Sequence, residues 1–112
     1  MADLSYSDFL KIDIRVGTIL RAEENNNLKI PSIILEIDFG QQIGIKKSSA
    51  QLKSNYEVQD LIHKQVAAVI NFPAKQIGKV ISEVLVLGFP DNQNEPILVS
   101  PDFKIENGGR IY

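Results

Sequence analysis

The chain has 112 residues, which is enough for one compact domain with a single hydrophobic core. It contains no cysteine, which excludes disulfides, thiolate metal sites and cysteine nucleophiles, and we expect a cytoplasmic protein. The longest apolar runs are only a few residues, far too short for a membrane span. The first residues have neither the basic start nor the apolar run of a signal peptide, so we expect none.

The net charge is −2, but the charges are unevenly distributed. Residues 1–45 carry seven acids and four bases, and residues 80–112 carry five acids and two bases. Residues 46–79 instead carry six lysines against two acids. Because the local potential decides where a polyanion docks, this middle third is the candidate nucleic-acid surface. The alternative is that these lysines are solvated side chains on ordinary loops.

The N-terminal third predicts a helical turn and then a strand. Ser5 and Asp8 have the spacing of a capping box, which predicts a short helical turn. The next strand is predicted at residues 13–22, and Gly17 within it indicates a bulge or tight bend where a side chain would crowd a neighbouring strand. The inward positions of this strand are predicted to be Ile12, Ile14, Val16, Leu20 and Ala22.

The second and third strands are predicted after a polar loop at residues 23–27. Residues 32–39 form the second, with Glu36 and Asp38 outward and four apolar residues inward: Ile33, Leu35, Ile37 and Phe39. Residues 42–48 form the third, with Ile43 and Ile45 inward.

The C-terminal half predicts a helix and more short strands. The helix spans residues 57–63 because its apolar residues recur at three- and four-residue spacing. Residues 65–71 form the fourth strand, with Val66, Ala68 and Ile70 alternating, and a lysine-bearing loop follows at 72–79. The fifth strand, 82–89, is apolar on both faces, which suits a strand covered on its outer side. A sixth short strand is predicted at 96–100.

Short strands, one central helix and the lack of a βαβ rhythm predict a small closed barrel. The helix between the third and fourth strands is a feature of OB-type barrels. We therefore expect an all-β, five-stranded OB-fold barrel forming one domain over residues 1–112, with its core at about 8–110.

Several strings resemble the tRNA-binding OB domain that is also found at the C-terminus of some methionyl-tRNA synthetases. The opening strand resembles that domain through residues 9–19, FLKIDIRVGTI. Five further segments resemble one branch of the family, the CsaA branch, in particular: 43–52 (IGIKKSSAQL), 69–77 (VINFPAKQI), 82–88 (SEVLVLG), 100–102 (SPD) and 107–112 (NGGRIY). The broader family continues Ser-Glu with Gly-Met, whereas Ser82-Glu83 is followed here by Val84-Leu85, as in the CsaA branch.

The resemblance implies a homodimer of OB barrels that binds tRNA, and for the CsaA branch an export-related chaperone activity. The alternative is a peptide-binding secretion chaperone in which RNA binding is vestigial. We expect the N-terminal turn and the C-terminal segment to pack across the dimer axis.

The candidate RNA-binding residues combine lysines with side chains that donate and accept hydrogen bonds. OB barrels bind nucleic acid across the second and third strands and the flanking loops. The predicted set is Lys46, Lys47, Ser48, Ser49, Gln51, Asn71, Lys75, Gln76, Lys79, Ser82 and Glu83. Alternatively, Ser48 and Ser49 cap the turn that follows them, and Asn71 satisfies turn backbone. Aromatic stacking candidates are few, which favours recognition of tRNA shape: Tyr6, Tyr56, Phe72 and Phe89.

Catalytic and cofactor motifs are lacking. His63 is the only histidine, which is too few for a histidine metal cluster, and no nucleophile elbow surrounds Ser48 or Ser49. Gly40 and Gly44 do not open a helix after a strand, so no phosphate-binding loop is predicted. Arg15 is predicted to pair with Asp13 on the surface. We expect a binding protein without enzymatic activity, metal or cofactor.

Overall fold

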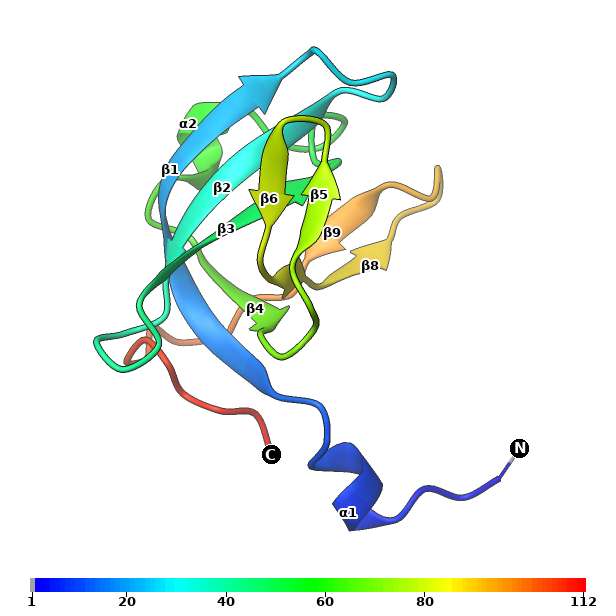
Figure 1. The fold of residues 1–112 in the computed structure, drawn as a ribbon, viewed down its shortest axis with the longest axis vertical. Helices are drawn as coiled ribbons and strands as arrows, with labels where there is room; N and C mark the ends of the chain where they lie inside the picture. The colour runs from blue at the N-terminus through cyan, green and yellow to red at the C-terminus, as the bar shows by residue number, and fades with distance from the viewer. Residues whose placement is uncertain (1) are drawn as a thin grey trace.

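The computed structural model describes residues 2–112. A strongly curled antiparallel sheet forms a half-barrel with an OB-like fold, confirming the predicted class (Figure 1). The strand order is β3-β2-β1-β4-β7. These strands are β1 (Ile14–Asn25), β2 (Ser32–Asp38), β3 (Ile45–Ala50), β4 (Gln65–Val69) and β7 (Leu85–Val86).

Two small hairpins and two short helices complete the chain. One hairpin is β5 (Lys75–Ile77) with β6 (Val80–Ser82), and the other is β8 (Gly88–Pro90) with β9 (Pro96–Leu98). The helices are α1 (Tyr6–Phe9) and α2 (Val58–Leu61), the latter between β3 and β4 as predicted. Among residues 2–112, no helix has the length and apolar character needed to cross a membrane.

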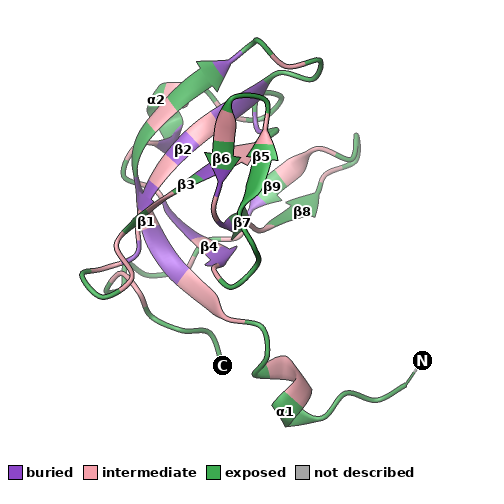
Figure 2. Ribbon diagram, in the orientation of Figure 1, coloured by how far each residue is buried: buried purple, intermediate pink, exposed green. Residues whose placement is uncertain are grey.

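The core is built by the inward positions of β1, β2 and β4, which are purple in Figure 2. The alternation predicted for β2 is confirmed: its odd-numbered residues are buried and Glu36 and Asp38 lie on the other face. Leu61 of α2 is fully buried in the same cluster. The fully buried apolar side chains include Ile19, Ile33, Leu35, Ile37, Leu61 and Val66.

A β-bulge changes the facing of β1. Ile19 pairs with Ile37 and Arg21 with Glu36, which leaves Leu20 as the extra residue. Ile19 is therefore fully buried and Leu20 is exposed, so the prediction that Leu20 faces inward is wrong. The strand also continues to Asn25, into the segment predicted as a polar loop.

Gly17 of β1 lies in close contact with buried side chains of the core, as predicted. A Cβ atom at this position would be 2.6 Å from Cγ2 of Ile37 and 2.8 Å from Cδ1 of Phe39. Glycine is therefore required by close packing at this bend.

The third strand begins later than predicted, and its side chains face the opposite sides of the sheet from those predicted. Gly44 has a φ of +88°, and the turn it forms delays the strand to Ile45. Ser48 pairs with Leu35 of β2 and is buried, whereas Ile45 is 56% exposed. The inward prediction for Ile45 is wrong. Ser48 and Ala50 instead share the facing of the β2 core residues, and Lys47 and Ser49 share the outer face.

The segment predicted as a loop at 72–79 contains β5, whose partner β6 ends at Ser82, where the fifth strand was predicted to begin. The predicted strand at 82–89 is instead divided, because β7 pairs with β4 and β8 pairs with β9. Only Leu85 and Val86 join β4 in the main sheet.

The two ends of the chain are fastened to β1. The predicted capping box is confirmed, with the Ser5 hydroxyl accepting from the Asp8 N–H and the Asp8 carboxylate accepting from the Ser5 N–H. Arg15 donates to Asp13 at 2.6 Å, as predicted, and also to the Gly108 carbonyl. Arg110 donates to the Leu10 carbonyl at 2.7 Å. The C-terminal segment and α1 therefore lie at the same end of the molecule (Figure 1).

Candidate nucleic-acid interface

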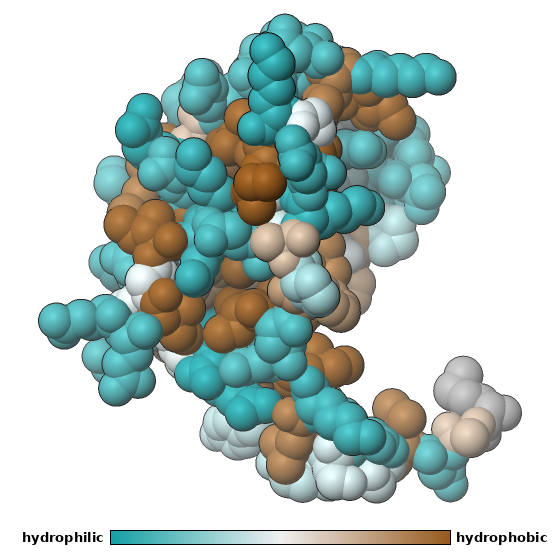
Figure 3. Space-filling view, viewed as in Figure 1, coloured by the Kyte–Doolittle hydropathy of each residue, from teal (hydrophilic) through white to brown (hydrophobic). Residues whose placement is uncertain are grey.

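Four predicted site lysines lie on two elements that pack together. Lys46 and Lys47 are on β3, Lys75 is on β5, and Lys79 is in the turn between β5 and β6. The Glu83 N–H, just after β6, bonds to the β3 backbone and so joins the hairpin to that strand. We call Lys46, Lys47, Lys75 and Lys79 the lysine rim. Figure 3 shows hydrophilic side chains interspersed with apolar ones on this face of the molecule.

The lysine rim is free of ion pairs within the described part of the chain, residues 2–112. By contrast, Lys53 is 3.6 Å from Glu24, and Lys11 is 3.2 Å from Asp8. Lys64 lies elsewhere, between α2 and β4, where its carbonyl accepts from Ile19. The six lysines of the middle third therefore do not form a single patch. Four of them share β3 and the adjoining hairpin, with Lys46 on the opposite face of β3 from Lys47.

Ser82 and Glu83 fasten the β5–β6 hairpin to the edge of β3. The Glu83 N–H donates to the Lys47 carbonyl at 2.8 Å, and the Glu83 carboxylate accepts from the Lys47 N–H at 3.0 Å. The Ser82 hydroxyl accepts from the Ser49 N–H at 3.0 Å. The Glu83 N–H and the Glu83 and Ser82 side chains thus take the place of a neighbouring strand at these positions.

The remaining polar candidates have distinct surroundings. Ser48 is buried, while the Ser49 hydroxyl is 3.1 Å from that of Ser32. Asn71 donates to the Lys11 carbonyl at 2.7 Å and accepts from the Asp13 N–H at 3.0 Å, which ties the segment after α1 to the end of β4. Gln76 donates to the Gly78 carbonyl within the hairpin turn, and Gln51 is exposed just beyond β3.

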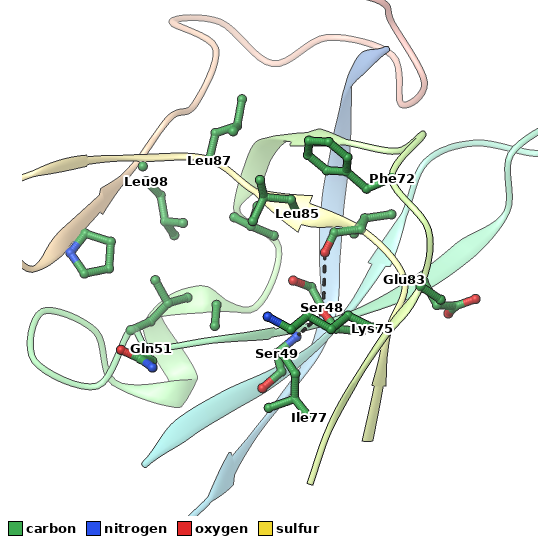
Figure 4. A pocket seen from close by; sticks show the side chains of 18 of the residues that line it. Ser48, Ser49, Gln51, Phe72, Lys75, Ile77, Glu83, Leu85, Leu87 and Leu98 are labelled. Atoms are coloured by element: carbon green, nitrogen blue, oxygen red, sulfur yellow. Dashed lines mark hydrogen bonds between the residues drawn. The ribbon is translucent and has the colours of Figure 1, made fainter. Parts of the chain in front are cut away.

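A pocket of about 870 Å³ opens between β3, β7 and the two hairpins. In Figure 4, Phe72, Leu85 and Leu98 lie on one side of it, and Ser49 and Lys75 lie on the other. The fifth strand was predicted to be covered on both faces, but Leu85 is 49% exposed at this opening. The run of apolar residues at 84–87 was the sequence signal for this pocket. The sequence could not show that β7 lies at the edge of the main sheet, which leaves part of this run exposed.

The aromatic candidates separate into core and surface. Tyr56 packs against the core, and its hydroxyl accepts from the Leu98 N–H at 3.0 Å. Phe72 is 53% exposed and lines the pocket beside Lys75. Tyr6 and Phe89 are exposed on other elements.

The structure shows no arrangement for metal binding in the part of the chain that it describes, with no group of three His, Cys, Asp or Glu side chains suitably placed. His63 is exposed and adopts a φ of 72°, with its N–H donating to the Ile19 carbonyl. The site therefore consists of cations, hydrogen-bonding groups and an apolar pocket, which suits binding.

A half-barrel of OB-like topology with a basic edge defines a class of small binding domains. The chain matches the family model described as "Putative tRNA binding domain" over residues 14–110, and it belongs to that family. It is similar to chaperone CsaA of Bacillus anthracis, with 43% identity over 99% of this chain and 100% of that one, and a TM-score of 0.92. CsaA of Picrophilus torridus is 45% identical over 98% of this chain and all of its own, with a TM-score of 0.89.

The chain is also related to part of much longer proteins. The methionine–tRNA ligase of Methanococcoides burtonii is 38% identical over 110 residues, which is 97% of this chain and 16% of that protein. That of Thermococcus onnurineus is 28% identical over 96% of this chain and 14% of its own length. These comparisons support a non-catalytic binding protein, because a match to the tRNA-binding domain covers nearly the whole chain.

Proposed function

We propose that this protein binds tRNA as a homodimer and that the lysine rim provides the contacts to phosphate. The observation that carries the proposal is the set of four ammonium groups, without ion-pair partners in residues 2–112, on β3 and the β5–β6 hairpin. Unpaired cations can neutralise phosphates without first breaking an internal ion pair. Ser49, Gln51 and Gln76 are placed on the same elements to add hydrogen bonds, and Phe72 offers an exposed ring for stacking.

Titration of labelled tRNA at several salt concentrations tests this proposal. Affinity is expected to fall as salt rises, by about 0.7 to 0.9 log units per log unit of salt for each phosphate neutralised. The double variant Lys75→Ala/Lys79→Ala is expected to flatten that slope by about one to two units. Lys104→Ala, an exposed lysine in the C-terminal segment, is the matched control and is expected to keep the slope. Absence of binding at low salt would overturn the proposal.

The proposed dimer uses an apolar surface at the chain ends. Arg110 donates to the Leu10 carbonyl, which joins the C-terminal segment to the N-terminal one, and the Ile111 N–H donates to the Ile14 carbonyl at the start of β1. We call their exposed apolar side chains the terminal apolar surface: Tyr6, Leu10, Ile12, Ile111 and Tyr112. A second copy of the chain would bury these side chains around a two-fold axis.

Sedimentation at micromolar concentration tests the dimer. The wild-type chain is expected to sediment as a dimer and Leu10→Asp/Ile111→Asp as a monomer, because each variant position would bury a charge. Ile30→Asp, at an exposed isoleucine in the loop before β2, is the control and is expected to remain dimeric. A wild-type protein that is only monomeric contradicts the proposal.

Polypeptide binding is the second candidate function, favoured by the apolar pocket and by the similar proteins named chaperones. A pocket lined by leucines with a polar edge suits apolar side chains better than phosphate. Suppression of aggregation of an unfolded client, with little dependence on salt, is the expected behaviour. Equal aggregation with and without the protein would exclude it.

A further inference from the structure

The outer edge of β3 is closed at Lys47 and at the Ser49 N–H and is open beyond them. Along this strand, the backbone groups of even-numbered residues face β2, and those of odd-numbered residues face outward. Of the outward groups, the Lys47 N–H and carbonyl both form hydrogen bonds with Glu83, and the Ser49 N–H donates to the Ser82 hydroxyl. We call these three bonds the seal, and it ends at the Ser49 N–H.

In the described part of the chain, two outward backbone groups beyond the seal are unpaired, although the Leu52 N–H donates to the Ala50 carbonyl where β3 ends. Within residues 2–112, neither the Gln51 N–H nor the outward Ser49 carbonyl has a hydrogen-bond partner. Ser49 and Gln51 both line the apolar pocket, and Gln51 is exposed. A strand edge with a free donor and a free acceptor is a template for pairing with another extended chain.

The opposite wall of the pocket suits the side chains of such a chain. Leu85 on β7 and Leu98 on β9 face the edge of β3 across the opening (Figure 4). In an extended peptide, alternate side chains point to the same side. One set would therefore contact these leucines while the backbone pairs with β3. Phosphate groups offer only acceptors, so in an RNA backbone only the ribose 2′-hydroxyl could donate to the Ser49 carbonyl, whereas each second residue of an extended peptide presents a donor and an acceptor on the same edge.

We propose that the pocket binds an extended polypeptide segment, which pairs with the Ser49 carbonyl at the end of β3 and the Gln51 N–H just beyond it, and inserts alternate apolar side chains against β7 and β9. This inference rests on the polypeptide-binding function proposed above and specifies its mode. The added strand would extend the ladder that Ser82 and Glu83 begin.

Backbone-methylated peptides test the mode separately from binding itself. The probe is a fluorescein-labelled decapeptide of alternating leucine and serine, compared with versions N-methylated at the leucine amides or at the serine amides. In an added strand, the amides that pair with the edge of β3 all belong to alternate residues of the peptide. The peptide methylated at those amides is expected to bind about tenfold more weakly than the parent, and the peptide methylated at the other amides is expected to lose much less affinity. Binding of the parent peptide with equal affinity for both methylated versions overturns strand addition while leaving polypeptide binding intact. No binding of the parent peptide overturns both.

The edge itself provides a second readout. Saturating parent peptide is expected to slow hydrogen exchange of the Gln51 amide at least several-fold in the wild-type protein, with the exposed Gln42 amide as the internal control. Gln51→Pro removes the donor and is expected to weaken peptide binding, whereas Gln51→Ala retains it and is expected to bind as wild type. If the peptide binds and leaves the Gln51 amide unprotected, strand addition is wrong. Protection of that amide by tRNA and not by peptide would assign the edge to RNA.

Discussion

Lys47 and Glu83 form a reciprocal pair in which the Glu83 N–H donates to the Lys47 carbonyl at 2.8 Å and the Glu83 carboxylate accepts from the Lys47 N–H at 3.0 Å. One residue thereby supplies both the donor and the acceptor that a neighbouring strand would offer to β3. The pair fastens the β5–β6 hairpin, with its lysines, to the main sheet. Glu83 therefore has a structural reason to be present, independent of any contact with RNA.

Replacing Glu83 separates these two roles. Glu83→Ala is expected to lower the free energy of unfolding by about 1 kcal/mol, because the Lys47 N–H loses its acceptor. Glu83→Gln keeps a side-chain oxygen for that N–H and is expected to remain close to wild type in urea denaturation. Both variants remove a negative charge beside the lysine rim, so neither is expected to weaken tRNA binding. A large loss of tRNA affinity in a fully stable Glu83→Gln variant would show that the carboxylate contacts RNA.

Gly17→Ala is expected to destabilise the barrel. Its Cβ would be 2.6 Å from Ile37 and 2.8 Å from Phe39, both of which are buried and cannot move freely. Overpacking of this kind costs about 1–3 kcal/mol. Gly109→Ala is the control because the nearest atom to its Cβ is 3.5 Å away. Thermal unfolding compares the two, and equal melting temperatures would contradict the packing argument.

Gln65 is expected to hold the C-terminal segment in place. Its amide donates to the Ile105 carbonyl at 2.7 Å and accepts from the Ile105 N–H at 3.0 Å. Gln65→Met preserves bulk but leaves these two backbone groups without partners, which is expected to cost about 1–3 kcal/mol. Hydrogen exchange of the Ile105 amide should accelerate in this variant. Gln93→Met, at an exposed position in the β8–β9 turn, should leave both measurements unchanged.

The turn between β8 and β9 is expected to loosen in acid. Hydrogen bonds from the Glu95 N–H, and then from the Asn55 side chain, hold the pKa of Asp91 below its ordinary value. A carboxylate with a lowered pKa stabilises the fold fully above its unfolded pKa, and this contribution is lost as the pH falls through the folded pKa. Amide exchange at Glu95 should therefore rise at the acid end of a pH series. Asp91→Asn should show no such pH-dependent step, and a step that persists in this variant would assign the titration to another group.

Local patterns in the sequence predicted much of the fold. The alternation of β2 and β4, the capping box at Ser5 and the close approach at Gly17 all follow from the preferences of a few neighbouring residues. The family resemblance is likewise confirmed, because matching strings in the correct order extend through nearly the whole chain.

Only the tertiary structure decided the facing of Leu20 and Ile45, and only it revealed the open end of the β3 edge. A side-chain period of two means that one bulged residue or one glycine turn reverses the facing of all the residues that follow. The sealing of β3 by Ser82 and Glu83 joins residues more than thirty positions apart in the sequence. The apolar pocket lies between β3 and β7, the two edge strands of the main sheet. The lack of a pairing strand between them produces no periodic pattern in the sequence, so the pocket could not be predicted from it.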